Sequence, residues 1–417
     1  MTIPDFLVGP FFCRVGANAK VFVYVCRVFH ELCTVTMIKV ILLMDYSSEH
    51  DRKLLRGMMR YSKENGPWLF YRPSPAFRFG ENMEEWAVKW EKEWHADAII
   101  GRWDEGKLHM LDNLDIPVVL QNNTKRSDVF SNLTGDYEAT GKLAAQYFRK
   151  RLFTDYAFFG RKDIVWSEER SRGFESEVLA EGGSFYKFLI SDSGYDRSEL
   201  EIWLKNLPKP IAMFCCDDSH ALMITEICKM INVSVPEDIA VLGVDDDELL
   251  CDISDPSISS IRMDVENGGY LTCQLLNERI SKRDTRTFNV SVKPLTINER
   301  GSTKIHNVSD KYVLEIVNYI DEHYFEDVSM ETLLGLVPLS RRSIEMRFKK
   351  AMGGGTIYQY LLSVRVARMA ELLITTERLF SDIVYEVGFR DIANVTRIFR
   401  RYKGCTPSEY RKRYCAK

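Results

Sequence analysis

The sequence has no uncharged apolar run long enough for a membrane span and no recognisable set of metal ligands. The apolar stretch within residues 1–36 is interrupted by Arg14, Lys20 and Arg27, so it falls short of the roughly 18 residues that a transmembrane helix needs. None of the ten cysteines belongs to a CxxC pair, and no His/Cys cluster has metal-ligand spacing. We therefore expect no membrane association, no disulfide framework, no metal and no cofactor.

The sequence also lacks the short motifs of the common enzyme classes. It contains no P-loop, no HExxH, no GxSxG and no Cys/His arrangement for nucleophilic catalysis. The seven histidines are scattered along the chain. An enzyme is therefore the weaker alternative, and turnover of a small molecule by the purified protein would support it.

Residues 1–36 form an extension that the sequence alone does not explain. Met37 is followed at once by the apolar run 38–44, which is typical of the first buried strand of a domain. We expect translation to start at Met37. The alternative is that residues 1–36 act as a weak signal or membrane anchor, and N-terminal sequencing of the native protein distinguishes the two.

Cysteines within apolar runs indicate the compartment. Cys215 and Cys216 end such a run, as small buried thiols do in a reducing environment. We therefore expect the protein to be cytoplasmic.

From Met37 to about residue 300, short apolar runs alternate with longer amphipathic ones. This alternation is typical of parallel sheets with helices on both faces, and about seven such units indicate two lobes rather than one sheet. The predicted strands are Val40–Met44, Ala98–Ile100, Val118–Leu120, Tyr156–Phe159, Phe185–Ile190, Ile211–Cys215 and Ala240–Val244. The predicted helices are Asp51–Glu64, Met83–Trp94, Tyr137–Lys150, Ser167–Glu181, Ser198–Asn206, Ser219–Ile231 and Val265–Ile280.

Carboxylates collect where several predicted strands end. Asp45, the pair 217–218 and the triplet 245–247 each follow an apolar run directly. Ligands of open parallel sheets lie beyond the carboxyl ends of the strands, and carboxylates there suit a polyhydroxyl ligand. The alternative is that these aspartates cap the helices that follow.

The C-terminal part differs from the rest in charge and in period. Residues 301–310 are rich in Gly, Ser, Thr and Asn and indicate a linker between a domain at 37–300 and another at 311–417. The second domain has a helical period throughout. From Pro338 onward there are 17 Lys and Arg against 7 Asp and Glu, within a chain whose net charge is -4. This asymmetry favours a polyanionic partner for the C-terminal domain.

An internal repeat with an offset of 51 residues lies in this basic domain. Leu336 corresponds to Val387 and Ser340 to Asp391. Each copy has a short apolar helix, a tight turn (with Gly388 in the second copy), a polar N-cap and a second helix. The second helix buries two apolar residues at i and i+4, which are Ile344 and Phe348 in the first copy and Val395 and Phe399 in the second.

The exposed face of each second helix carries long polar side chains. The residues are Arg342, Glu345, Met346 and Lys349 in the first copy and Asn394, Arg397, Arg400 and Arg401 in the second. Such a face fits the major groove of DNA. The span 357–374 has the spacing of one continuous helix, which would hold the two copies at fixed separation. A helical bundle without DNA is the alternative, but the positive charge favours DNA.

The segment from about 311 to 413 resembles the AraC-type DNA-binding domain. The matching stretches are LSRRSIEMRFKK (339–350), Arg365-x-x-Arg368-x-Ala370-x-x-Leu373, Val387-Gly388-Phe389 and Gly404-x-x-Pro407-x-x-Tyr410-Arg411. The resemblance implies transcription regulation by two helix-turn-helix units on one face of DNA. It implies base contacts by Arg342, Glu345, Met346, Ala393, Asn394 and Arg397, and phosphate contacts by Arg347, Lys349, Arg400 and Arg401.

Residues 38–300 resemble the ligand-binding core of the lactose-repressor and periplasmic-binding-protein superfamily. Matching stretches are the pair Asp51-Arg52, WSEERSRGF (166–174) and SVPEDIAVLGVDDDELL (234–250). The expected fold is therefore a two-lobed α/β periplasmic-binding-protein-like domain followed by an all-α domain with two helix-turn-helix units. This order of parts is similar to that of the xylose regulators of the AraC family.

The second resemblance implies that a sugar binds between the lobes. The expected sugar is a pentose, and D-xylose is the first candidate. The implied ligand residues are Asp45, Arg52, Trp166, Arg170, Asp217 and Asp245. The alternatives are that Arg170 pairs with Glu168 or Glu169 and that Trp166 belongs to the core. The resemblance further implies a homodimer, activation more than repression, and a possible contact with RNA polymerase. A hexose, a nucleoside or no small molecule stays open as an alternative.

Overall fold

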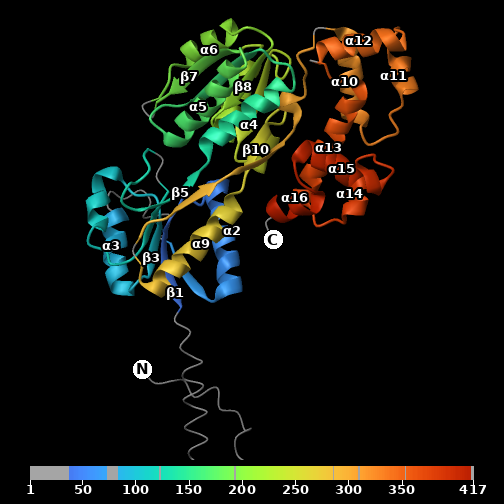
Figure 1. Cartoon of the computed structure of the whole chain (residues 1–417). Helices are drawn as coiled ribbons and strands as arrows, with labels where there is room; N and C mark the ends of the chain where they lie inside the picture. The colour runs from blue at the N-terminus through green and yellow to red at the C-terminus, as the bar shows by residue number, and fades with distance from the viewer. Residues whose placement is uncertain are drawn as a thin grey trace, which may run out of the picture.

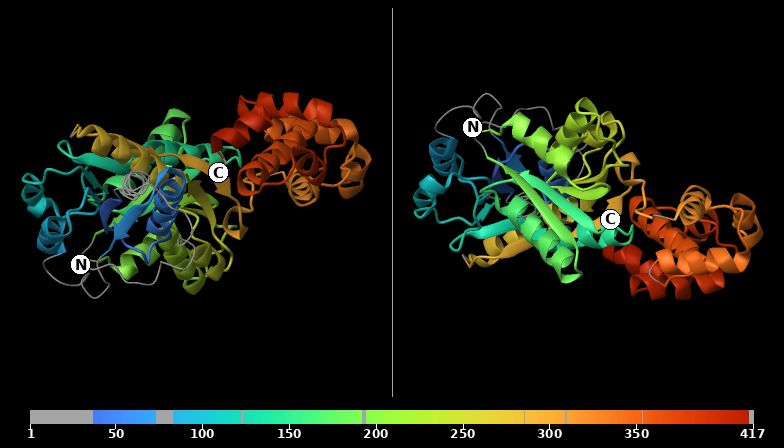
Figure 2. Two further views of the ribbon diagram at one scale, coloured as in Figure 1. Left: turned by 90° about the horizontal axis from the view of Figure 1, so that it is seen from below. Right: turned by 90° about the horizontal axis from the view of Figure 1, so that it is seen from above.

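The structure is a computed structural model that describes residues 37–72, 83–121, 124–191, 194–284, 286–308, 310–352 and 354–414. The extension 1–36 lies outside this part, so a start at Met37 stays a prediction. Within the described ranges, no helix is both long and apolar enough to pass through a lipid bilayer. Figures 1 and 2 show two α/β lobes and a helical unit that lies beside the second lobe.

The first lobe is a six-stranded parallel sheet with the order β11-β5-β4-β3-β1-β2. Side chains of β1 alternate between its two faces, because successive residues of a strand point in opposite directions. Val40 and Leu42 pack under α2 and α9, and Ile41 and Leu43 pack under α3 and η2. The elements are β1 (Ile38–Leu43), α2 (Glu49–Asn65), β2 (Trp68–Tyr71), α3 (Met83–Trp94), β3 (Ala98–Gly101), η2 (Glu105–Leu111), β4 (Val118–Leu120), β5 (Ser131–Gly135), α9 (Val265–Lys282) and β11 (Asn289–Val292).

The second lobe is also six-stranded, with the order β12-β10-β9-β8-β6-β7, and only β12 is antiparallel to its neighbour. Helices α4 and α5 cover one face, and α6 and α7 cover the other. The elements are α4 (Tyr137–Arg149), β6 (Asp155–Arg161), α5 (Val165–Ala180), β7 (Ser184–Ile190), α6 (Arg197–Asn206), β8 (Ile211–Cys215), α7 (Asp218–Met230), β9 (Ile239–Val244), α8 (Glu248–Ile253), β10 (Ser259–Met263), β12 (Pro294–Asn298) and η3 (Gly301–Thr303).

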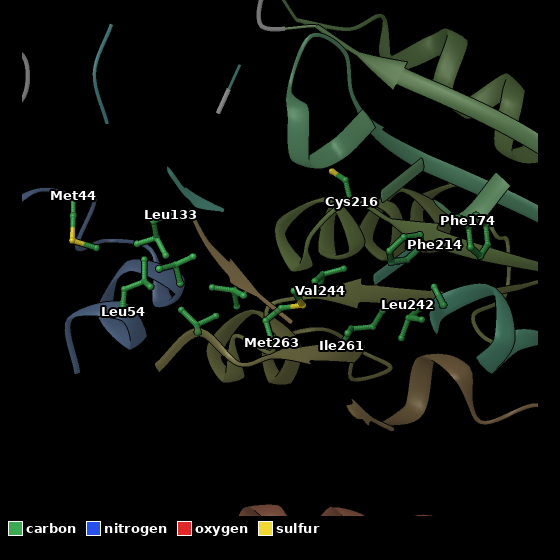
Figure 3. Close-up of a cluster of buried hydrophobic side chains, with 14 of the residues drawn as sticks. Met44, Leu54, Leu133, Phe174, Phe214, Cys216, Leu242, Val244, Ile261 and Met263 are labelled. Atoms are coloured by element: carbon green, nitrogen blue, oxygen red, sulfur yellow. The ribbon is translucent and has the colours of Figure 1, made fainter. Parts of the chain in front are cut away.

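The predicted two-lobed α/β class is confirmed, and the chain crosses between the lobes three times. It leaves the carboxyl ends of β5, β10 and β11 to enter α4, α9 and β12. The carboxyl ends of the parallel strands of both sheets therefore face each other near these crossings. A continuous apolar cluster supports them: Figure 3 shows it running from Leu54 in the first lobe through Met263 to Phe214 in the second.

The second lobe extends past residue 300. Ser302 and Thr303 are fully buried, and the Ser302 hydroxyl donates to the Val241 carbonyl at 2.6 Å. The first residues of the expected 301–310 linker thus pack on this lobe.

The helical unit has two small cores that share one long helix. Its elements are α10 (Lys311–His323), α11 (Met330–Leu336), α12 (Arg341–Ala351), α13 (Ile357–Thr375), α14 (Phe380–Glu386), α15 (Ile392–Lys403) and α16 (Pro407–Tyr414). Helix α13 contributes Ile357 and Leu361 to one core and Val366 and Met369 to the other. The predicted continuous helix between the two repeat copies is therefore present, and it fixes their separation.

The turn between α14 and α15 depends on Gly388. Its φ is +87°, and a Cβ there would lie 2.7 Å from the carbonyl oxygen of Tyr324. A side chain would thus meet both a strained backbone and a steric clash. In the first copy, the Ser340 hydroxyl accepts from the Ser343 N–H and caps α12, as predicted.

Candidate functional site

Arg170 and Asp245 meet at the face of the second lobe that points toward the first. Arg170, on α5, is only 3% exposed, and its Nη2 lies 3.5 Å from Asp245 Oδ1. Its Nη1 donates to the Cys216 carbonyl at the end of β8. The Nε of Arg170 is buried without a hydrogen-bond partner, so this guanidinium retains a donor.

Asp245 lies where the two lobes touch. Lys53 of α2 donates to the backbone carbonyls of Asp245 at 2.8 Å and Asp246 at 3.0 Å, and His50 Nδ1 lies 3.8 Å from Asp245 Oδ1. Burial acts to raise the pKa of Asp245, but Arg170, His50 and Lys53 outweigh it and hold the pKa at about 2. The carboxylate is therefore ionised at neutral pH, with one buried oxygen that has no hydrogen-bond partner.

A buried carboxylate organises the facing side of the first lobe. Asp51, fully buried on α2, accepts from the Asp45 N–H at 2.6 Å, from Gln121 Nε2 at 3.0 Å and from Arg102 Nη2 at 3.4 Å. Gln121 Oε1 and Arg102 Nε are buried without partners. This face thus offers one acceptor and one donor.

Sequence reasoning did not single out Arg102 or Gln121, and it used Asp51 only as part of a resemblance. The available signal was position, because Arg102 directly follows β3 and Gln121 directly follows β4. His50 and Lys53, which reach the second lobe, were also missed.

Three of the predicted ligand residues have local structural partners. The Asp45 carboxylate accepts from Ser47 N–H and Oγ in a tight turn. The Arg52 guanidinium pairs with Glu49 and donates to the Ser47 carbonyl. The Asp217 carboxylate accepts from the His220 N–H at 2.8 Å, which is the helix-capping alternative given above.

Trp166 and Tyr137 flank the Arg170 guanidinium. The Arg170 Cζ lies 5.4 Å from the ring centroid of Trp166 and 5.3 Å from that of Tyr137. Trp166 is half-buried against the hydrophobic core, as the core alternative predicts, and its contact with a ligand stays a prediction. The alternative pairing of Arg170 with Glu169 does not occur, because Glu169 forms a bidentate ion pair with Arg126 of the first lobe.

The other strand-end carboxylates stabilise the second lobe itself. Burial raises the pKa of Asp218 well above its usual value, and its oxygens accept from Ser260 Oγ and the Asp247 N–H. Asp246 pairs with Arg300 at 2.9 Å, and Asp247 caps α8. These contacts leave Asp245 as the carboxylate of this group that faces the first lobe.

One group in the described part has atoms near enough to share a metal ion. Potential ligand atoms of Cys216, Asp217 and His220 all lie within 4.8 Å of one another. However, burial raises the pKa of the Cys216 thiol well above its usual value, which opposes the thiolate that a metal requires. The Asp217 carboxylate also holds the His220 ring Nδ1 at 2.7 Å, so capping of α7 explains the arrangement.

Helix α12 presents its predicted residues to solvent. Ile344 and Phe348 are buried, and Arg342, Glu345, Met346 and Lys349 are exposed. Glu345 forms an ion pair with Arg341 at 2.9 Å. Arg347 pairs with Asp310 at 3.0 Å, so its side chain is tied to the start of α10.

Helix α15 has the same design. Val395 and Phe399 are buried, and the exposed residues are Asn394, Arg397, Arg400 and Arg401. Asn394 accepts from Arg397 Nη2 at 3.2 Å and donates to Asp391 at 2.9 Å. The side chain of Ala393 lies outside the described part. Two exposed polar helix faces thus flank the shared helix α13.

Two family models match the chain, one in each part. Residues 145–303 match a periplasmic binding protein-like domain, and residues 335–413 match a helix-turn-helix domain. Together with the two-lobed fold and the exposed faces of α12 and α15, these matches define a DNA-binding transcription regulator with a periplasmic-binding-protein-like domain.

The relatives confirm the predicted resemblance to the xylose regulators. The chain is 24% identical over 386 residues to the xylose operon regulatory protein of Escherichia coli (strain K12), covering 89% of this chain and 96% of that protein. The corresponding protein of Haemophilus influenzae is 23% identical over 389 residues, covering 89% and 98%. The structure of the xylose-binding transcription activator xylR has the same fold, with a TM-score of 0.57, 22% identity and coverage of 92% of this chain and 100% of that one.

Proposed function

We propose that the protein regulates transcription by binding specific DNA sites under the control of a sugar, D-xylose, held between its two lobes. The names of the relatives support the ligand, and the helix-turn-helix domain supports the DNA. The observation that carries the sugar is a set of buried polar atoms without hydrogen-bond partners on the two facing lobes. They are Arg102 Nε and Gln121 Oε1 on the first lobe and Arg170 Nε and Asp245 Oδ1 on the second.

This set suits a neutral polyol. Two of the atoms are donors and two are acceptors, and a hydroxyl group can satisfy either kind. Leaving such atoms buried and unsatisfied costs about 1–3 kcal/mol each, so a ligand that pairs with them recovers that free energy. Trp166 and Tyr137, beside Arg170, add aromatic surface for the apolar side of a sugar ring.

Titration calorimetry of the full chain tests the ligand. We expect a saturable heat with D-xylose and weaker or no heat with D-ribose, L-arabinose and D-glucose. Heat with none of the pentoses would contradict the proposal. Heat with a different sugar alone would keep the sensor but replace its ligand.

The DNA-binding half of the proposal depends on α13. Because this helix belongs to both cores, α12 and α15 stay at a fixed separation, as is needed to enter successive major grooves about 34 Å apart. We further propose that the protein acts as a homodimer in the cytoplasm, activates transcription and contacts RNA polymerase.

Helix α4 gives the ligand a route to the DNA-binding unit. Its first residue, Tyr137, lies beside Arg170. Two residues after its end, the Arg151 carbonyl accepts from the Asn307 N–H of the linker at 2.9 Å. Leu152 packs on the core around Val308 in the helical unit. A shift of α4 at the sugar would therefore reach the helical unit through this helix and the turn that directly follows it.

A polar cluster fastens the linker to the helical unit at the far end of this route. His306 is buried, and its Nε2 lies 2.8 Å from Asp321 Oδ2 of α10 and 3.0 Å from the hydroxyl of Tyr360 on α13. The Tyr360 hydroxyl donates to Asp321 Oδ1 at 2.8 Å.

We expect Tyr360→Phe to weaken the effect of the sugar on DNA affinity while leaving sugar affinity unchanged. The substitution removes two hydrogen bonds of the linker cluster and keeps the ring in the core. Allosteric coupling is typically about 1–3 kcal/mol, and losing half of it changes the DNA-affinity ratio severalfold. Fluorescence anisotropy with and without D-xylose measures the ratio. Tyr358→Phe, at an exposed position of the same helix, is the control, and an unchanged ratio in Tyr360→Phe would refute the route.

A further inference from the structure

We propose that Asp51 is a positioning residue that fixes the hydrogen-bond direction of the first lobe, with Gln121 as an acceptor and Arg102 as a donor toward the ligand. This inference rests on the proposed function, and it adds a selection rule. The ligand must present a donating hydroxyl to Gln121 and an accepting oxygen to Arg102.

The direction of the Gln121 amide follows from the chemistry of its partner. An ionised carboxylate can only accept hydrogen bonds, so the group at 3.0 Å from Asp51 Oδ1 is the amide nitrogen of Gln121. The other end of the amide is then the oxygen, and Gln121 Oε1 is the buried atom without a partner. Asp51 thereby prevents the flipped amide, which would present a donor.

The same carboxylate ties together the ends of three adjacent strands. Asp45 follows β1, Arg102 follows β3 and Gln121 follows β4, and these strands are neighbours in the sheet. Arg102 approaches with Nη2, which lies 3.2 Å from Asp51 Oδ2, while its buried Nε has no hydrogen-bond partner and keeps a donor for the ligand. One carboxylate thus orients both side chains.

A purely local role does not explain Asp51. An acidic residue in the first turn of a helix favours the helix dipole, but a solvent-exposed carboxylate serves that purpose as well. Asp51 is instead 0% exposed, and the three groups that donate to it lie outside its helix. Burying a carboxylate is costly unless its partners compensate, so the site is built around this contact.

Exchanging the carboxylate at position 51 with the amide at position 121 tests the proposal. Sugar affinity is measured by calorimetry of the full chain with D-xylose. In Asp51→Asn the side chain at position 51 can donate as well as accept, so the Gln121 amide is no longer fixed. We expect affinity to fall at least tenfold. In Gln121→Glu two carboxylates face each other, and we expect a similar loss.

The double variant Asp51→Asn/Gln121→Glu should recover affinity to within about threefold of the wild type. The new amide at position 51 would donate to the new carboxylate at position 121, whose second oxygen again faces the ligand as an acceptor, and the net charge is unchanged. A merely structural role predicts no such rescue, because each substitution would disturb packing independently. Asp112→Asn, at an exposed position of the same lobe, is the control for loss of a carboxylate.

The outcomes separate this inference from the proposed function. The positioning role alone is overturned if the wild type binds D-xylose but Asp51→Asn loses less than threefold in sugar affinity. It is also overturned if the double variant does not recover sugar affinity. Absence of heat in the wild type with every pentose overturns the proposed ligand, and this inference with it.

Discussion

Arg170→Met is expected to weaken sugar binding by about one to two orders of magnitude and to weaken the response to D-xylose accordingly. Arg170 is nearly fully buried and pairs with Asp245, and its Nε is a donor without a partner in the protein. A hydrogen bond to a charged group contributes about 1.5–3 kcal/mol, so removing this guanidinium should lower sugar affinity about 10- to 150-fold. Calorimetry with D-xylose measures the loss.

The substitution also leaves the Asp245 carboxylate without its main counter-charge. Removing one member of a buried ion pair typically destabilises a protein by about 3–5 kcal/mol. The double variant Arg170→Met/Asp245→Asn avoids that uncompensated charge. Its free energy of unfolding should be closer to that of the wild type, while its sugar affinity should stay low. Wild-type sugar affinity in either variant would mean that Arg170 does not contact the ligand.

Arg342→Ala and Arg397→Ala are each expected to weaken specific DNA binding. Both side chains are exposed, Arg342 on the polar face of α12 and Arg397 on the polar face of α15. A side chain that contacts base edges contributes about 1–3 kcal/mol of specific affinity. The two effects should add in the double variant, because the residues lie on different helices with separate cores.

Binding of the variants to a selected site and to random duplex at moderate salt separates base contacts from charge. Lys89→Ala, at an exposed position in the first lobe, removes one positive charge outside the helical unit and should have no effect on DNA affinity. Loss of Lys349, Arg400 or Arg401 should instead weaken both kinds of DNA and reduce the salt dependence. Unchanged specific affinity in both arginine variants would refute their role as base contacts.

The sequence predicted strands with continuous apolar runs well and strands with polar residues poorly. Ile211–Cys215 was predicted with its observed bounds, because a buried parallel strand is a continuous apolar run. Ser131–Gly135 was missed, since SNLTG has neither an apolar run nor a clear alternation. This strand is held by pairing with β4 and β11, which is information that the local sequence does not contain.

The candidate sugar-binding residues show a similar limit of prediction from sequence. An aspartate after a strand can face a ligand or cap the following helix, and both positions have the same local sequence. The local sequence therefore does not distinguish Asp245 from Asp217. The structure separates them by partner, which is Arg170 for the first and the His220 N–H for the second. Asp51 was not identified because its role depends on Arg102 and Gln121, which are distant in sequence.

The helical unit was predicted more completely, because its repeat duplicates a physical pattern. Buried residues at i and i+4 and a polar N-cap recur at a fixed offset, and each defines local geometry. The contact of Tyr360 with His306 was not predictable, since Tyr360 fits the apolar spacing of α13 equally well as a core residue.

Selection from random-sequence DNA with the full chain, in the presence and absence of D-xylose, tests the central claim most directly. The account predicts enriched sites with two short elements about one helical turn, or roughly 10 base pairs, apart, bound with different affinity when the sugar is present. Recovery of no sequence above the random background under either condition would contradict it.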